Sequence, residues 1–351
     1  MLFMKSLLTI SLYSVFLIIF NSLSIKYNFL LDKKVSPHKF FTSKEVVPLT
    51  GGLLLIISIF FYYNNIFFLI FSILIFTLGI LADLNIIKNS ITKFIIQFIV
   101  VFFFLHFLDL NISNTKVFFL DYFITNKIFS ILFTTFCLLI LINGTNFIDG
   151  VNTLVCGYYI LVITVILYIA VNNQLHFSFD NYYYLLLCLT VIYIFNLFSK
   201  NYLGDSGSFL LAFIVGSNLI VLCNDNINLT KYISPIFVVL LLWYPAFENL
   251  FSIIRRLIYK THLTRPDNFH FHQLLFILIK FKFKKRIKDK YINSLTGNLI
   301  NLYNLIIFIM GSQIYSHTKY LSYLVIFNIL VYLFFYYLIK KINLNKYFFI
   351  K

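Results

Sequence analysis

The sequence predicts an all-α integral membrane protein, a polytopic helical bundle of about eleven transmembrane helices. The 351-residue chain has a mean hydropathy of +0.91, and only 11% of its residues are charged, about half the share found in soluble domains. Apolar runs recur along its whole length, and many approach the roughly 20 residues that cross about 30 Å of hydrocarbon. We expect residues 1–351 to form one transmembrane domain, with a long basic cytoplasmic loop at residues 252–298 within it.

The eleven expected spans include the first apolar run, which lacks an A-x-A-like cleavage site and is therefore kept as a helix. The four cysteines lie in or beside apolar runs without metal-ligand spacing, which indicates small buried hydrophobic side chains. The spans are expected at about residues 6–23, 48–63, 66–82, 91–107, 128–142, 153–171, 182–198, 206–222, 233–251, 299–314 and 321–339.

The positive charges predict how these spans are oriented. Of the 28 Lys and Arg residues, 23 fall on one side of the predicted membrane and 5 on the other. The positive-inside rule then places the C-terminus in the cytoplasm and the N-terminus outside, in a multi-pass inner (plasma) membrane protein. The net charge of +16 thus indicates topology, and no nucleic-acid partner is expected.

Five polar segments fall on the predicted cytoplasmic side, and they hold most of the polar residues that composition does not require. They are residues 36–52, 79–97, 143–152, 200–208 and 248–273. In the third segment Asn146 and Asp149 are three residues apart, so a helical turn would place them side by side. In the second, Asp83 ends a span, while Lys93 and Gln97 share one face of the next helix. A lone Asp at a span end is as often a solvated terminus as a site residue.

The last two of these segments carry further candidate groups. Asp205, Ser206 and Ser208 begin a span, which indicates either a helix cap or a phosphate or metal site at the helix N-terminus. His270 and His272, two residues apart, suit an irregular loop that binds metal or phosphate better than one helix face. Carboxylates facing cations at one interface suit Mg²⁺ and a diphosphate substrate, because Mg²⁺ prefers a few carboxylates together with substrate phosphates.

At these residues the sequence resembles the polyprenyl-phosphate N-acetylhexosamine-1-phosphate transferases (glycosyltransferase family 4), and the resemblance rests on five motifs in order. It is closer to the undecaprenyl-phosphate GlcNAc-1-phosphate transferase branch than to the phospho-MurNAc-pentapeptide translocase branch, whose loop carries three consecutive His. The motifs are Pro-x-x-Gly-Gly at 48–52, Gly79 to Asp83 with Lys93 and Gln97, Asn-x-x-Asn-x-x-Asp-Gly at 143–150, Gly-Asp-Ser-Gly-Ser at 204–208, and Pro266-Asp267 with His270 and His272.

The resemblance implies transfer of a sugar-1-phosphate from a UDP-sugar to undecaprenyl or another polyprenyl phosphate, with release of UMP, at the cytoplasmic face. It further implies a cell-surface glycan pathway such as O-antigen of lipopolysaccharide, common antigen or teichoic acid. Whether the protein forms a homodimer stays open at this point. The implied cofactor is Mg²⁺ or Mn²⁺, bound by Asp205. The implied catalytic residues are Asp83, Asp149, Lys93, His270 and His272, and the implied cofactor-binding residues are Asn146, Gly204 and Ser206. Asn146 and Asp149 would hold the nucleotide side or help to bind the metal.

Several positions depart from the family pattern. Ala82 replaces the first Asp of a pair, Asn152 replaces a second Asp, and Gln273 replaces a last His. Two alternatives therefore stay open. One is a non-catalytic homologue that binds UDP-sugar or lipid phosphate, and the other is a secondary transporter, which needs ionisable residues near the membrane midplane.

Overall fold

The computed structural model describes residues 2–32, 46–173, 175, 179–226, 232–260, 269–283 and 287–348. Within these ranges the chain forms fourteen α-helices, and its only β-type pairing is an isolated bridge between Leu31 and Pro48. The helices are α1 Leu2–Lys26, α2 Gly51–Tyr62, α3 Ile66–Asp83, α4 Ser90–Phe107, α5 Phe118–Ile124, α6 Lys127–Ile148, α7 Leu154–Asn173, α8 Phe179–Leu197, α9 Gly204–Asp225, α10 Pro235–Leu241, α11 Trp243–Ile258, α12 Phe271–Phe283, α13 Asp289–Gln313 and α14 Thr318–Phe348.

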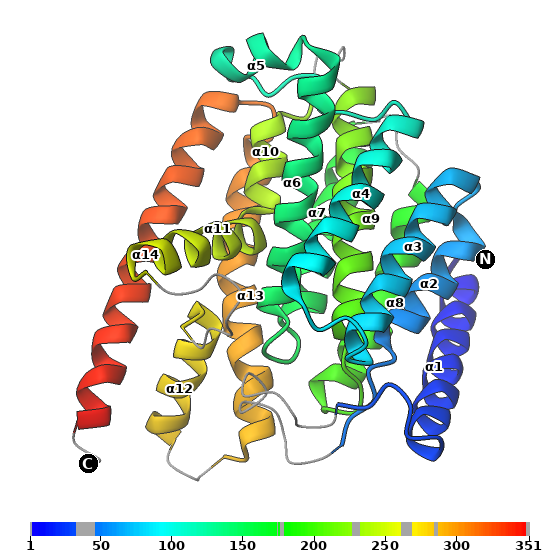
Figure 1. Cartoon of the computed structure of the whole chain (residues 1–351), viewed down its shortest axis with the longest axis vertical. Coiled ribbons are helices and arrows are strands. Elements are labelled where there is room, and N and C mark those ends of the chain that lie inside the picture. Colours follow the sequence, from blue (N-terminus) through cyan, green and yellow to red (C-terminus); the bar gives the residue numbers. More distant parts are fainter. Residues whose placement is uncertain are drawn as a thin grey trace.

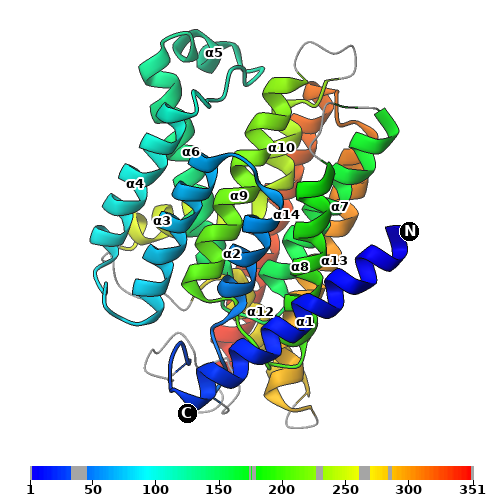
Figure 2. The ribbon, with the colours of Figure 1, turned by 90° about the vertical axis from the view of Figure 1, so that its right-hand side faces the viewer.

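Helix α9 lies at the centre of the bundle and packs against α2, α3 and α6 (Figures 1 and 2). Nearly every residue from Gly204 to Leu222 is buried. A helix that is apolar on all sides is expected in such a central position. In contrast, α1 and α14 are largely exposed and lie at the two edges of the view in Figure 1.

The outer surface of the bundle is apolar over long stretches, as expected for contact with lipid. Exposed large side chains include Leu8 and Ile19 on α1, Phe103 on α4, and Leu330 and Phe334 on α14. Among the described residues, eight helices are long and apolar enough to cross a membrane, or up to nine if one bent pair counts as a span. The chain is therefore a polytopic helical membrane protein.

The count of eleven spans stays a prediction, although a helix or helix pair covers each predicted range. The predicted span 48–63 holds α2, which has only 12 residues, and the span 182–198 holds α8. Neither helix is among the eight that are long and apolar enough to cross a membrane. The predicted span 233–251 contains the bent pair, in which α10 and α11 meet at 74°. That range is a broken element and not one straight helix.

Backbone polar groups at this break between α10 and α11 have hydrogen-bond partners. Pro245 has no N–H and so makes no helical hydrogen bond to the preceding turn, but it is tolerated in the first turn of a new helix. The Tyr158 hydroxyl donates to the Leu241 carbonyl at 2.8 Å and accepts from the Tyr244 amide at 3.3 Å. Non-helical backbone at membrane depth requires such partners, because no water is available there.

Two polar segments expected as loops are partly helical. Helix α6 continues to Ile148, so Asn143 and Asn146 lie on its last turns and not in a loop after residue 142. The basic segment 252–298 contains the end of α11, all of α12 and the start of α13. His272 lies in the first turn of α12 and His270 immediately precedes it, so these residues do not form the expected irregular loop.

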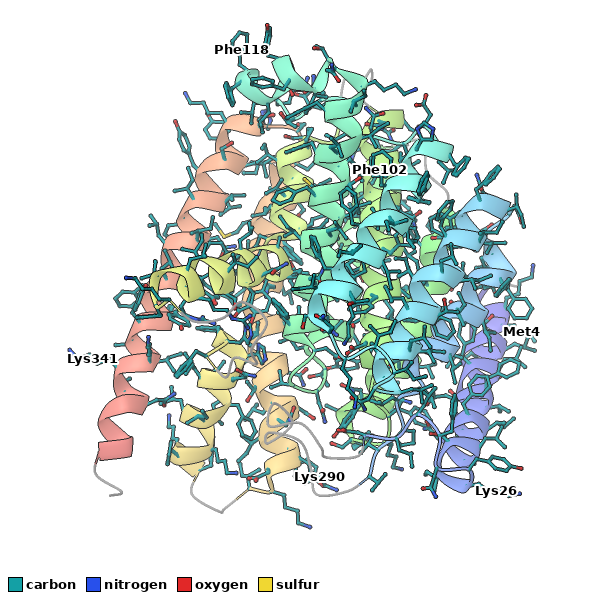
Figure 3. All side chains as sticks on the ribbon, viewed as in Figure 1. Met4, Lys26, Phe102, Phe118, Lys290 and Lys341 are labelled. Carbon is teal, nitrogen blue, oxygen red and sulfur yellow. The ribbon has the colours of Figure 1, made fainter. Side chains whose placement is uncertain are left out.

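The two ends of the bundle differ in character (Figure 3). Phe118, on the short helix α5, lies at one end, and its side chain is 92% exposed. Lys26 and Lys290 lie at the other end. The end of α3 and the start of α9 meet at this second end, as the contacts of Asp83 below show.

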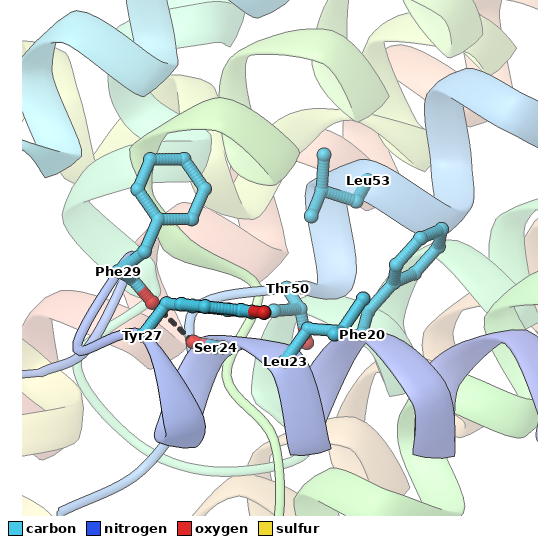
Figure 4. A pocket seen from close by; sticks show the side chains of 7 residues that line it. All are labelled: Phe20, Leu23, Ser24, Tyr27, Phe29, Thr50 and Leu53. Carbon is cyan, nitrogen blue, oxygen red and sulfur yellow. Dashed lines mark hydrogen bonds between the residues drawn. The ribbon is translucent and has the colours of Figure 1, made fainter.

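An apolar cavity of about 410 Å³ lies between the end of α1 and the start of α2 (Figure 4). Its lining residues are Phe20, Leu23, Ser24, Tyr27, Phe29, Thr50 and Leu53. Thr50 and Asn201 hydrogen-bond to Asn21 of α1 and to each other, which holds α1 against the segment before α9. The cavity contains none of the predicted site residues.

Candidate active site

Glycines bring α2 and α3 into backbone contact with the first turn of α9. A Cβ added at Gly79 of α3 would lie 2.2 Å from the Ser206 Cα, and one at Gly52 of α2 would lie 2.7 Å from the Gly207 amide nitrogen. No side chain fits at such separations. The glycines of two separate motifs therefore share one physical task, which is to place the start of α9 directly against α2 and α3.

Asp83 caps α9 from outside that helix. Its Oδ1 accepts from the Asp205 amide at 2.8 Å and its Oδ2 accepts from the Ser206 amide at 3.0 Å. A residue at the N-cap normally satisfies these amides, but Leu203 in that position provides no side-chain cap. The helix dipole also favours a carboxylate at this end.

The Asp205 and Ser206 amides are thus both hydrogen-bonded to Asp83, and Gly204 and Ser206 lie beside this contact. Gly204 has φ +75°, and a Cβ there would lie 2.8 Å from the Asp83 carboxylate. Ser206 is 1% exposed. Both residues pack beneath the α9 terminus, against Asp83, α2 and α3.

Asp205 is the carboxylate on which groups from other helices converge. Lys93 of α4 places its Nζ 3.3 Å from Asp205 Oδ2, and the Asn146 amide of α6 donates to Oδ1 at 2.9 Å and to Ser208 Oγ at 3.2 Å. The side chains of Lys93 and Asp205 are 24% and 30% exposed. Residues far apart in sequence, Lys93, Asn146 and Asp205, thus form one partly exposed polar cluster.

The face shared by Lys93 and Gln97 is confirmed. Gln97 is buried, and its Oε1 accepts from the Asn143 amide at 2.9 Å. This bond fixes α4 against α6 one turn deeper than the contact of Lys93 with Asp205. Asp149 is the C-cap of α6 and is half-buried, so it follows the same polar turn.

Asn152 belongs to the tight turn between α6 and α7. Its amide donates to Ser199 Oγ at 2.7 Å. Thr153 has φ +66°, which is a strained conformation for a β-branched residue. The Thr153 backbone is bonded by the amides of Asn196 and Asn301. The residue in the place of the family's second Asp therefore supports the turn.

His270 is held by a fully buried carboxylate on α11. Its Nδ1 lies 3.0 Å from Glu248 Oε1, which also accepts from the Phe271 amide at 3.1 Å. Glu248 Oε2 accepts from the Tyr332 hydroxyl of α14 at 2.5 Å. Glu248 is the first residue of the polar segment 248–273, and nothing in the sequence pointed to Tyr332.

Gln273, in the place of the family's last His, has a local structural role. Its side-chain oxygen accepts from the His270 amide at 3.2 Å. An N3 residue that reaches back to the N-cap amide is one half of a capping box. Pro266 and Asp267 of the same motif lie outside the described residues.

His272 is fully buried, and neither ring nitrogen has a hydrogen-bond partner within the described part of the chain. Burial, together with the neighbouring His270, lowers the pKa of His272 from 6.5 to about 3. The ring is therefore neutral near pH 7 and offers hydrogen bonds but no charge. A Cβ at Gly150 would lie 2.4 Å from its Nε2, so this glycine makes room for the ring.

The polar turn at the end of α6 connects the two groups of side chains. Asn146 contacts Asp205, the Phe147 ring lies 5.4 Å from the His270 ring, and Gly150 contacts His272. This is the physical reason for a polar interruption in such an apolar chain. One short segment touches both the α9 terminus and the histidines at the start of α12.

The oxygen atoms around Asp205 are of the kind that binds Mg²⁺, but they are few. Carboxylate, amide and hydroxyl oxygens of Asp205, Asn146 and Ser208 are hard ligands, and Mg²⁺ typically uses only one or two carboxylates together with waters and substrate phosphates. The described residues contain no group of three or more His, Cys, Asp or Glu side chains that could hold a metal ion. The set therefore fits a metal that arrives with a phosphorylated substrate.

The fold and the site define a polytopic membrane protein with a polar cluster at one end of its helices. Residues 65–223 match the model of glycosyl transferase family 4. The matched range contains Asp83, Lys93, Asn146, Asp149 and Asp205.

A curated relative from Bacillus subtilis (strain 168) is described as a probable undecaprenyl-phosphate N-acetylglucosaminyl 1-phosphate transferase. It is 28% identical over 140 residues, which cover 38% of this chain and 37% of the relative. The chain thus aligns with little more than a third of that relative's length.

Proposed function

We propose that this protein transfers an N-acetylhexosamine-1-phosphate from a UDP-sugar to a polyprenyl phosphate and releases UMP. A phosphate oxygen of the lipid would attack the sugar-bearing phosphorus of the UDP-sugar. The bond from that phosphorus to the UMP oxygen would break, and the product would be a polyprenyl-diphosphate sugar. The observation that carries the proposal is the convergence of Lys93, Asn146 and Asp83 on Asp205 from three other helices.

Phosphoryl transfer depends mainly on positioning and on neutralising charge, and the residues suit these tasks. Lys93 supplies a positive charge beside the site. Asp83 positions the α9 terminus and, with the remaining lone pairs of its oxygens, is the candidate to position or deprotonate the lipid phosphate. Asn146 and Asp149 would contact the nucleotide side, and His270 and His272 the diphosphate or sugar.

Asp205, with Asn146 and Ser208 beside it, is the proposed ligand for Mg²⁺ or Mn²⁺. When bound, such an ion neutralises negative charge on the diphosphate. Gly204 serves this site because the absence of a Cβ leaves room for the Asp83 carboxylate, and Ser206 packs against Gly52 and Gly79. We further propose that this end of the bundle faces the cytoplasm of the inner membrane and that the protein acts in a cell-surface glycan pathway, as a homodimer.

The decisive experiment is a UMP-release assay on membranes with UDP-N-acetylglucosamine and undecaprenyl phosphate, with the lipid product analysed in parallel. Asp205→Asn should abolish turnover at unchanged expression. The matched control is Asp109→Asn, because Asp109 is an exposed carboxylate that forms an ion pair with Lys127. Near-normal activity of Asp205→Asn at saturating Mg²⁺ would reject the assignment, and absence of UMP release from wild type with a panel of UDP-sugars would favour a non-catalytic homologue.

A further inference from the structure

The buried group that the proposed chemistry leaves unexplained is Glu248. Its side chain is 0% exposed and lies on α11, and the aromatic residues Tyr244 and Tyr332 are beside it. Removing a carboxylate from water carries a penalty of several kcal/mol that an ion pair often fails to offset. A fully buried carboxylate in an aromatic surrounding is therefore poorly explained by stability alone.

The contacts of Glu248 are directional. Oε1 lies 3.0 Å from His270 Nδ1 and accepts a hydrogen bond from the Phe271 amide at 3.1 Å, and Oε2 accepts one from the Tyr332 hydroxyl. The carboxylate therefore joins α11, the start of α12 and α14. Because the Phe271 amide is the first of α12, Glu248 caps that helix from outside, as Asp83 caps α9.

The same contacts determine the state of the His270 ring. An ionised carboxylate only accepts hydrogen bonds, so His270 Nδ1 must carry the proton that lies between them. A partner at one ring nitrogen fixes both the tautomer and the orientation of an imidazole. The Nε2 side of His270 is then left for substrate, and the Phe147 ring at 5.4 Å supports it from α6.

We propose that Glu248 is a positioning residue for His270. It holds the imidazole with Nδ1 protonated and with Nε2 presented to the phosphate groups of the substrate. The proposal rests on the proposed function for the identity of that substrate, but the assigned tautomer of His270 does not depend on turnover.

The test is a double-mutant cycle on UMP release, with kcat and KM for the UDP-sugar measured separately. Glu248→Gln keeps the side-chain shape and removes the charge. It should lower kcat by about 10-fold or more, as expected for loss of a group that orients a functional histidine, with a smaller change in KM. In the His270→Gln background the same substitution should change kcat by less than about 3-fold, because positions that act through one another are not additive.

A residue that only supports the fold would give equal fold-losses of kcat in both backgrounds, and that result would overturn the proposal. Asp121→Asn is the matched control, since Asp121 is a carboxylate that holds a loop through Thr115. If Glu248→Gln does not fold, Glu248→Asp replaces it, because one methylene less withdraws the carboxylate from His270 while the charge is kept. A loss of kcat in Glu248→Asp that persists unchanged in the His270→Gln background again overturns the proposal.

Nitrogen-15 NMR of histidine-labelled wild-type protein tests the same inference without activity. The His270 signal is assigned by its loss in His270→Gln. A protonated Nδ1 supports the proposal even if wild type releases no UMP, in which case the proposed function alone fails. An unprotonated Nδ1 overturns the proposal whatever the activity.

Discussion

Asp83→Asn tests whether Asp83 acts through the start of α9. The carboxylate accepts from two backbone amides, at 2.8 and 3.0 Å, and the amide side chain of Asn offers only one acceptor oxygen. One α9 amide then faces an NH₂ group. A hydrogen bond to a charged group contributes about 1.5–3 kcal/mol, and loss of the negative charge at a helix N-terminus adds about 0.3–1 kcal/mol. The expected loss of stability is therefore about 2–4 kcal/mol.

Turnover should fall as well, because the same amides position Asp205 between Lys93 and Asn146. We expect UMP release to drop by at least about 10²-fold, the lower end for a positioned proton acceptor. The assay pairs thermal unfolding in detergent with UMP release in membranes. Asp180→Asn is the control, because Asp180 also lies in the first turn of a helix but is exposed.

The double variant Asp83→Asn with Ala82→Asp separates local geometry from charge. Adjacent residues on a helix point about 100° apart, and Ala82 is buried at 6% exposure. A carboxylate at position 82 should therefore miss the α9 amides and restore neither stability nor turnover. Recovery of both by the double variant would refute this reasoning, as would an Asp83→Asn protein with unchanged thermal midpoint and UMP release.

Three further outcomes are expected. Gly79→Ala should lower the free energy of unfolding by about 1–3 kcal/mol and reduce UMP release, because the added Cβ would lie 2.2 Å from the Ser206 backbone. Gly216→Ala is the control, because its Cβ would meet only the ends of leucine side chains, and its losses should be smaller. Equal losses in the two variants would contradict the argument from backbone contact. The pKa of His272 is lowered from 6.5 to about 3 in the folded protein, so its contribution to the free energy of unfolding is present above pH 6.5 and is lost as the pH falls. Acidification from pH 8 to 5 should lower the free energy of unfolding by about 2 kcal/mol. A His272→Gln protein that loses the same stability on acidification would show that His272 is not the cause. Reporter fusions at Asn65 and at the C-terminus should read outside and inside, respectively, and an external C-terminus would invalidate the predicted topology.

The fold class and most of the candidate site follow from local properties of the sequence. Long apolar runs determine membrane helices, and dense polar residues within such runs stand out because they are expensive in lipid. The pairing of Lys93 with Gln97 needed only the helical period. Asp205 at the start of α9 needed only the position of the apolar run that follows it.

What each side chain contacts was decided by tertiary packing. Asp83 and Asp205 are 122 residues apart, and only the close approach that Gly79 and Gly52 allow brings a carboxylate of α3 to the amides of α9. The break at Leu242 depends on the Tyr158 hydroxyl from α7, which no local pattern contains. The pairing of Glu248 with His270 likewise required α11, α12 and α14 to meet. Local sequence thus determined which residues are polar in a membrane chain, while the geometry of helix packing decided which of them meet in the polar cluster and which hold the others in place.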